Sequence, residues 1–367
     1  MTLRSSLMKF GTIHYMEWHK TKPESGIDLC RSGITPRGIE DLDLQWSDLE
    51  LSGSDYYGYP PLITAISQRF ETSEEHIVST LGTSQGLFLL CAALLSPGDR
   101  VVIEDPAYEP IVAVPEVFGT EIFRYKRRFE EDWAVNLDHF ESSIPEGTRM
   151  IVMTNLHNPT GISVSDKDIE RLADIAASKD AWLCIDEVYR EFMDDWNGTT
   201  AFGLADNILV ASGLGKVYGL GDLRCGWVMA PPDMAERMRR IVDYINVEGV
   251  FIGEKIASLA FGQLEILKEK DKAQLEHNRS LIKNFMASES DRLSWVEPAA
   301  GVTCFPRLES GETGDNLAER LLREYDTAIT PGSFFGAPEH VRIGFGGSSE
   351  YLSQGLEKIS DALDSYQ

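Results

Sequence analysis

The chain has 367 residues, of which 43% are hydrophobic and 25% are charged, values typical of a folded globular protein with a large core. Aspartate and glutamate number 59 and lysine and arginine 34, which gives a formal net charge of −25. This charge disfavours binding to nucleic acid or to an anionic membrane by general electrostatic attraction. The acidity fits two hypotheses, adaptation to a salt-rich cytoplasm and an ordinary acidic enzyme.

No secretory signal pattern opens the sequence, because polar residues interrupt residues 1–18. The longest apolar run, LFLLCAALL at residues 87–95, is too short to cross a bilayer. We therefore expect a cytoplasmic protein with no nucleic-acid, membrane or metal partner. The cysteines form no CxxC pair and are expected to be buried free thiols: Cys30, Cys91, Cys184, Cys225 and Cys304.

Apolar strands alternate with amphipathic helices between about residues 61 and 230. In chain order the pattern predicts a helix over 60–70, a strand over 76–80, a helix over 84–95 that Ser84 caps, and a strand over 100–105. The pattern then predicts strands over 121–126, 149–155, 181–187 and 207–213, and a helix over 165–180 capped by Ser165 or Asp166. Continuous apolar strands between helices predict an α/β fold with a mostly parallel sheet covered on both faces.

The pattern changes near residue 249, which predicts a second domain. A long charged amphipathic helix over 254–286 follows, and the remainder is typical of a smaller α+β unit. The expected organisation is an N-terminal segment 1–40 packed with the C-terminal lobe, a large domain 41–250, and a connecting helix with a small domain over 251–367.

An aromatic stretch, FGTIHYMEWH, occupies residues 10–19. Its residues His14, Tyr15, Trp18 and His19 have helical spacing. This spacing fits two alternatives, a terminal helix docked on the core and a lid over a substrate.

Ligands of an open parallel sheet bind beyond the carboxyl ends of its strands. Thr83 and Ser84 follow one strand at a helix N-terminus, where free backbone N–H groups suit a phosphate, although a simple helix cap is the alternative. Tyr108 follows the next strand and can stack on a flat ligand, or can be an ordinary core or surface tyrosine. Asn158, in TNLHNPTG, points outward from a turn or merely forms it.

Two further stretches carry charged groups where a ligand could meet them. Asp186 and Tyr189 end the strand in CIDEVYREF, and a carboxylate there needs a positive partner, from a ligand or from a salt bridge. Lys216 lies in SGLGKVYGLG, whose glycines allow close approach of a ligand and whose setting can desolvate an amine nucleophile. Arg224, eight residues later, can bind a phosphate through two N–H groups.

The motifs NPTG, DEVY, K…GLGDLRCGW and VRIGFGG occur in this order, and from RSGI at 31–34 to residue 347 the chain resembles the class I/II aminotransferases. These are fold-type I enzymes that use pyridoxal 5′-phosphate (PLP). The resemblance implies a large α/β domain with a smaller α+β domain and a homodimer. It also implies transfer of an amino group from an L-amino acid to a 2-oxo acid.

The resemblance assigns roles to these candidate residues. Lys216 resembles the lysine that bonds to PLP and moves the substrate proton, and Asp186 the carboxylate that pairs with the ring nitrogen. Asn158 and Tyr189 would bind the ring's phenolic oxygen, and Tyr108 would stack on the ring. The expected phosphate ligands are Thr83, Ser84, Ser212 and Arg224, and the expected substrate ligands are Arg342, for the α-carboxylate, with Gly33 and Asn158.

Two features depart from the family pattern. Gly213 and Gly215 stand where the family usually has hydroxyls, so that Ser212 alone remains nearby and a weaker grip on the phosphate is expected. A positive φ at either glycine would explain the change. Tyr57, in SDYYGYPP, matches imperfectly the tyrosine that reaches a partner's phosphate, and a turn aromatic is the alternative.

The motifs leave two other functions open. Lyases, cyclases and amino-acid oxidases share this fold and these residues, so the fate of the substrate carbanion is not specified. A binding or regulatory protein without turnover is the alternative from another class, although no helix-turn-helix or basic segment accompanies the motifs.

Overall fold

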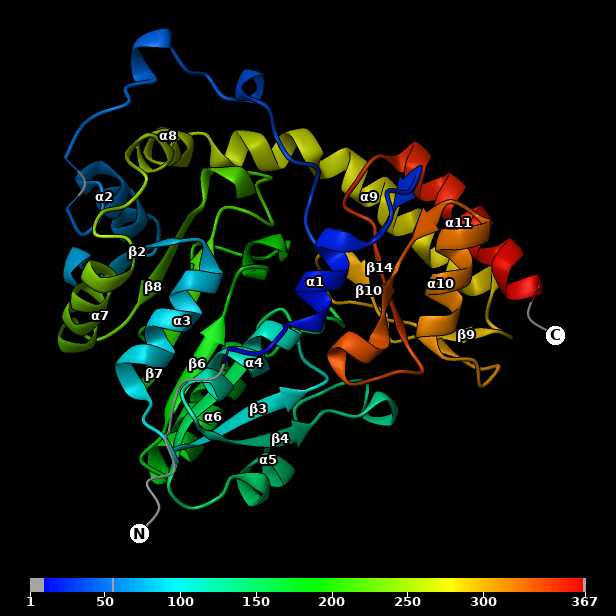
Figure 1. Ribbon diagram of the computed structural model, residues 1–367, viewed down its shortest axis with the longest axis horizontal. Helices are drawn as coiled ribbons and strands as arrows, with labels where there is room; N and C mark the ends of the chain where they lie inside the picture. Colours follow the sequence, from blue (N-terminus) through cyan, green and yellow to red (C-terminus); the bar gives the residue numbers. More distant parts are fainter. Residues whose placement is uncertain (1–9, 55, 366–367) are drawn as a thin grey trace.

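The structure is a computed structural model that describes residues 10–54 and 56–365, so that residues 1–9 of the expected N-terminal segment lie outside it. A seven-stranded sheet with the order β2-β8-β7-β6-β5-β3-β4 forms the larger lobe (Figure 1). Its strands are β2 Ile77–Leu81, β3 Arg100–Asp105, β4 Glu121–Lys126, β5 Thr148–Thr154, β6 Trp182–Asp186, β7 Ile208–Gly213 and β8 Cys225–Met229.

The sheet is mostly parallel, as the sequence predicts. Strands β7, β6, β5, β3 and β4 pair in parallel, and β8 runs antiparallel to both β7 and β2. The carboxyl ends of the parallel strands therefore lie along one edge, where β5 and β6 place Thr154 opposite Asp186.

Helices cover both faces of this sheet. On one face Leu62, Ile169 and Leu172 pack against strand residues such as Ile151, and on the other Leu90 packs in the core that contains the alternate strand residues. Helix α6 illustrates why these helices pack on the sheet: its apolar residues recur at helical spacing and form one side that is buried. The helices of this lobe are α2 Pro60–Arg69, α3 Thr83–Leu94, α4 Glu109–Val117, α5 Leu137–Ser143, α6 Asp166–Ser178, α7 Pro232–Ile245 and α8 Phe251–Phe261.

A second, smaller core joins both ends of the described chain. Strand β1 pairs in parallel with β12, so that residues 27–28 pack with the C-terminal lobe. Helix α9 runs from the larger lobe into this one, where α11 packs on α9 and α10 packs on α11 (Figure 1). The elements are α1 His14–Thr21, β1 Ile27–Asp28, α9 Leu264–Ser288, β9 Leu293–Ser294, β10 Thr303–Cys304, β11 Arg307–Leu308, α10 Gly314–Glu324, β12 Thr327–Ala328, β13 Thr330–Pro331, β14 Val341–Gly344 and α11 Ser349–Asp364.

Two local predictions are wrong and one is confirmed. Helix α3 begins at Thr83 after Gly82, whose φ is 76°, and among the described residues no side chain caps it, so Ser84 is not the cap. The helix expected over 254–286 is two helices, because the chain breaks at 262–263. Ser165 does cap α6, since its hydroxyl accepts the Asp168 N–H at 3.2 Å.

No helix within residues 10–54 and 56–365 is long and apolar enough to cross a membrane. All five cysteines are buried. In the same part of the chain, no group of three or more potential metal-ligating side chains comes together.

Candidate active site

A cavity of about 200 Å³ opens at the carboxyl ends of the parallel strands. It lies where an open α/β sheet binds its ligands, beyond β2, β6 and β7. Eight of the residues proposed from the sequence line it: Thr83, Ser84, Tyr108, Asn158, Asp186, Tyr189, Lys216 and Arg224.

The other proposed residues lie outside this lining. Ser212 is buried, with its hydroxyl 3.5 Å from the Glu187 carbonyl oxygen. Tyr57 lies beside α7, where its hydroxyl accepts a hydrogen bond from Arg240 Nη1 at 2.6 Å. Gly33 packs against the main chain of Lys216.

Lys216 lies in the loop that follows β7 and lines the cavity, where its amine donates to the Ser32 hydroxyl at 3.0 Å. Burial lowers the pKa of Lys216, and the positive charge of Arg342 acts in the same direction. Tyr15 and Asp186 oppose this shift. The neutral amine, which is the form that acts as nucleophile or base, is therefore more populated near neutral pH than in an exposed lysine.

Asp186 ends β6, half-buried at the wall of the cavity. Burial raises the pKa of Asp186 to about 6, although the Val188 N–H, which donates to its carboxylate at 3.0 Å, and the amine of Lys216 hold the pKa down in part. Above that pH the group is an anion in a setting of low polarity. Such an anion gains most from a cationic partner, such as the protonated nitrogen of a bound heterocycle.

The start of α3 contributes N–H donors to the cavity lining. The first turn of α3 leaves its backbone N–H groups without intrahelical partners, beside the positive end of the helix dipole. Arg224 adjoins this turn, since its Nη2 donates to the Leu81 carbonyl at 2.8 Å. Arg224 itself has φ 53°, a conformation uncommon outside glycine, and its Nη1 donates to the Gly221 carbonyl at 3.1 Å.

The two glycines that replace family hydroxyls sit in close contact with neighbouring backbone. A Cβ on Gly213 would lie 3.0 Å from the Cys225 carbonyl oxygen, and a Cβ on Gly215 would lie 3.2 Å from Gly221 Cα. Neither glycine has a positive φ, so the conformational explanation is wrong. The structure instead explains both glycines by the close packing of their loop against β8 and Gly221, which leaves little room for a side chain.

We expect Gly215→Ser to bind PLP about tenfold more tightly than Gly215→Ala, because both carry the Cβ that crowds Gly221 but only the serine hydroxyl can donate a charge-assisted hydrogen bond to the phosphate. Gly215→Ala is the matched control, since it adds the Cβ without the hydroxyl. The dissociation constant of PLP measured for the three proteins at one salt concentration checks this. Equal affinity of the serine and alanine variants would contradict it.

Arg342, on β14, is buried behind the cavity and is held by three groups. Its Nη1 donates to Asn158 Oδ1 at 3.0 Å, and its Nη2 donates to the Tyr15 hydroxyl at 3.0 Å and the Cys30 carbonyl at 2.9 Å. Tyr15 thus comes between the guanidinium and the open space.

Helix α1, which carries Tyr15, is docked on the larger lobe. The Glu109 carboxylate at the start of α4 accepts the backbone N–H groups of His14, at 2.9 Å, and of Tyr15, at 2.5 Å. The Tyr15 ring also meets the edge of Tyr108, with ring centroids 5.3 Å apart. In this structure the aromatic segment is a helix docked on the larger lobe, which was one of the two alternatives. Tyr15 also connects this helix to the site through its contact with Arg342.

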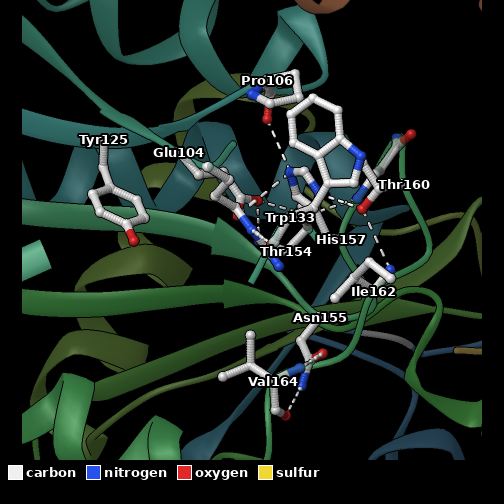
Figure 2. Close-up of polar contacts among 12 residues, drawn as sticks. Glu104, Pro106, Tyr125, Trp133, Thr154, Asn155, His157, Thr160, Ile162 and Val164 are labelled. Carbon is white, nitrogen blue, oxygen red and sulfur yellow. Dashed lines mark hydrogen bonds and ion pairs between the residues drawn. The ribbon is translucent and has the colours of Figure 1, made fainter. Parts of the chain in front are cut away.

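A buried polar network fixes the loop that carries Asn158 (Figure 2). The Glu104 carboxylate accepts the backbone N–H of Thr154 at 2.6 Å and pairs with Arg127 at 3.0 Å, and the Thr154 hydroxyl accepts the Asn158 N–H at 3.0 Å. His157 Nε2 donates to the Pro106 carbonyl at 2.9 Å. Burial lowers the pKa of His157, so the ring is neutral, and its hydrogen bond to Pro106 helps to hold the loop in place.

Sequence reasoning did not assign two residues of the site to it. Ser32 lines the cavity and bonds to both Lys216 and Tyr189. Tyr15 was recognised only through its helical spacing. The sequence feature that could have indicated Ser32 is its place in the RSGI motif, next to Gly33.

The residues present fit PLP. The N–H groups of α3 with Arg224 suit its phosphate, the amine of Lys216 suits its aldehyde, and the Asp186 carboxylate suits its ring nitrogen. All of these groups line one cavity, so a single ligand can meet them together.

Comparisons with known proteins agree with this geometry. The family model described as aminotransferase class I and II matches residues 48–359. The chain is 30% identical to capreomycidine synthase of Streptomyces vinaceus over 307 residues, covering 83% of this chain and 79% of that protein.

Two solved structures have the same fold over nearly the whole chain. A PLP-dependent aminotransferase from Streptococcus suis superimposes with a TM-score of 0.91 at 26% identity, covering 98% of this chain and 99% of that one. The PLP-dependent cyclase OrfR has a TM-score of 0.89 at 24% identity over 100% of both chains, which shows a shared fold. The chain therefore belongs to the class I and II aminotransferase family and is a PLP-dependent enzyme of that type.

Proposed function

We propose that this enzyme transfers an amino group from an L-amino acid to a 2-oxo acid. The observation that carries the proposal is the shared cavity of Lys216 and Asp186, with Arg342 held against Asn158 behind it. An amine, a carboxylate and a buried guanidinium are the groups that amino transfer needs for proton movement, cofactor activation and carboxylate binding.

In this proposal each side chain has one task. Arg342 binds the substrate α-carboxylate through two N–H groups after Tyr15 yields its position. Asp186 keeps the proton on the ring nitrogen, and PLP when bound supplies the sink for the electron pair left at the substrate Cα. The neutral amine of Lys216 takes the proton from that Cα.

Cyclisation of an amino acid is the second candidate. It is favoured by the fold that the chain shares with the PLP-dependent cyclase OrfR, beside the 30% identity to capreomycidine synthase. Lys216 and Asp186 specify proton removal from Cα and leave the fate of the carbanion open. The same site could then direct the carbanion to ring formation in place of amino transfer.

One experiment separates the two candidates. The enzyme with PLP is incubated with single L-amino acids and 2-oxoglutarate, and products are identified by mass spectrometry. Glutamate and the 2-oxo acid of the donor in equal amounts support amino transfer. A cyclic amino acid formed without glutamate supports the second candidate and overturns the first.

We expect Arg342→Lys to raise the KM for every amino-acid substrate by about tenfold or more, with a smaller effect on kcat. The reason is that an ammonium replaces a planar guanidinium that can bind a carboxylate through two parallel hydrogen bonds. Steady-state kinetics with two donors of different side chain check it. An unchanged KM for both would remove Arg342 from the carboxylate site.

A homodimer in the cytoplasm completes the proposal. Tyr57 lies beside α7 in contact with Arg240, and the exposed apolar side chains of Tyr244, Ile245 and Val247 at the end of α7 support a face covered by a second copy. The five buried thiols support a reducing compartment. A solution mass of one chain across the working concentration range would contradict the dimer.

A further inference from the structure

Three consecutive residues of the N-terminal segment hold Lys216 at both of its ends. The Ile34 N–H donates to the Lys216 carbonyl at 3.0 Å, and a Cβ on Gly33 would lie 2.9 Å from that carbonyl oxygen. At the other end of the lysine, its amine donates to the Ser32 hydroxyl at 3.0 Å. Close approach to the Lys216 backbone is therefore the reason that residue 33 is a glycine.

The Ser32 hydroxyl is itself fixed. It is 6% exposed, lines the cavity, and accepts a second hydrogen bond from the Tyr189 hydroxyl at 2.8 Å. A hydroxyl oxygen accepts through two lone pairs, and both are occupied here. Tyr189 thus sets where the Ser32 oxygen lies, and that oxygen sets where the amine of Lys216 lies.

A lysine side chain has four flexible carbons, so a free amine in a cavity samples several positions. A reaction that needs this amine at one face of a substrate is faster when an acceptor already holds it there. We propose that Ser32 is a positioning residue that holds the free amine of Lys216 in place for proton transfer. This inference rests on the proposed function of Lys216.

The ionisable groups that face the Lys216 amine come from several elements. They are Tyr15 and His19 of α1, Arg31 of the N-terminal segment, Asp186 of β6 and Arg342 of β14, while Tyr189 contacts the Ser32 hydroxyl. Replacing Ser32 leaves all of these in place. A change in the titration of Lys216 in Ser32→Ala therefore reports the lost hydroxyl, and Ser32→Thr, which keeps a hydroxyl, serves as the rescue.

The first test uses the full chain without PLP. Lys216 is acetylated by a trace of acetic anhydride at a series of pH values, and its labelling is quantified by peptide mass spectrometry. Because the Ser32 oxygen stabilises the protonated amine, the pH midpoint of labelling is lower in Ser32→Ala than in the wild type and returns in Ser32→Thr. The expected change at a pH below the midpoint is several-fold faster labelling.

The second test uses the PLP-bound enzyme. Ser32→Ala lowers kcat for amino transfer about tenfold and leaves the KM within about twofold, since the carboxylate site is unaltered. Ser280→Ala is the matched control, because Ser280 is exposed on α9 and its hydroxyl donates to the Glu276 carbonyl four residues earlier. It leaves both the labelling midpoint and kcat unchanged.

Identical labelling midpoints and kcat values in the wild type and Ser32→Ala would overturn the positioning role. Equal losses in Ser32→Ala and Ser32→Thr would also overturn it, because they would indicate packing and not the hydroxyl. Absence of amino transfer in the wild type would contradict the proposed function instead, while the labelling of the PLP-free chain would still decide whether Ser32 holds the amine.

Discussion

Replacing Lys216 with alanine is expected to abolish amino transfer, with a loss of about 10⁴-fold or more in kcat, while PLP still binds without a covalent link. The loss follows because no other amine is placed in the cavity, among the described residues that line it, to take the proton from the substrate Cα. The steady-state rate, and the cofactor retained on the protein after borohydride reduction and denaturation, check both parts.

Lys167→Ala is the control for this substitution, since Lys167 is exposed on the first turn of α6, away from the cavity. It should behave as the wild type in both measurements. Turnover by Lys216→Ala close to that of the wild type would refute the role of the lysine, whatever the control shows.

Asp186→Ala is expected to lower kcat by about two to four orders of magnitude. Without the carboxylate, the ring nitrogen of PLP loses the anion that keeps it protonated, and the cofactor becomes a poorer electron sink. Asp186→Asn, which keeps the size of the side chain and removes its charge, should lose nearly as much. Single-turnover rates for the three proteins check this, and near-normal activity of the asparagine variant would assign the role to another group.

The same residue predicts a pH dependence of PLP binding. Burial raises the pKa of Asp186 to about 6 in the free protein, and only the ionised carboxylate pairs with a protonated ring nitrogen. The affinity for PLP should therefore fall as the pH decreases below about 6 and level off above it. Asp186→Asn should not show this fall in PLP affinity at low pH. Titrations of both proteins with PLP at pH values from about 5 to about 8 check the prediction.

The larger lobe could be predicted from the sequence because its central strands are continuous apolar runs, such as residues 149–155, bounded by turns. The residues at the carboxyl ends of these strands were found for the same reason, since parallel strands bring those ends to one edge. Strand β8 was not predicted, because it lies directly after the glycine loop of Lys216 and alternates little.

The contacts that complete the site could not be predicted in this way. Ser32 and Lys216 are 184 residues apart, and Tyr15 and Arg342 are 327 residues apart. No periodicity links such pairs, because they meet only when the N-terminal segment packs against the smaller lobe and α1 docks on Glu109. The position of Ser212 away from the cavity depends likewise on side-chain direction at the end of β7.

The measurement that tests the central claim most directly is the stoichiometry of a single half-reaction. The PLP-bound enzyme is mixed with an L-amino acid and no 2-oxo acid, and the products are quantified. Amino transfer predicts one equivalent of the donor's 2-oxo acid per active site, with no ammonia, and a second equivalent only after 2-oxoglutarate is added. Continuous formation of ammonia, peroxide or a cyclic product without added 2-oxo acid would contradict it.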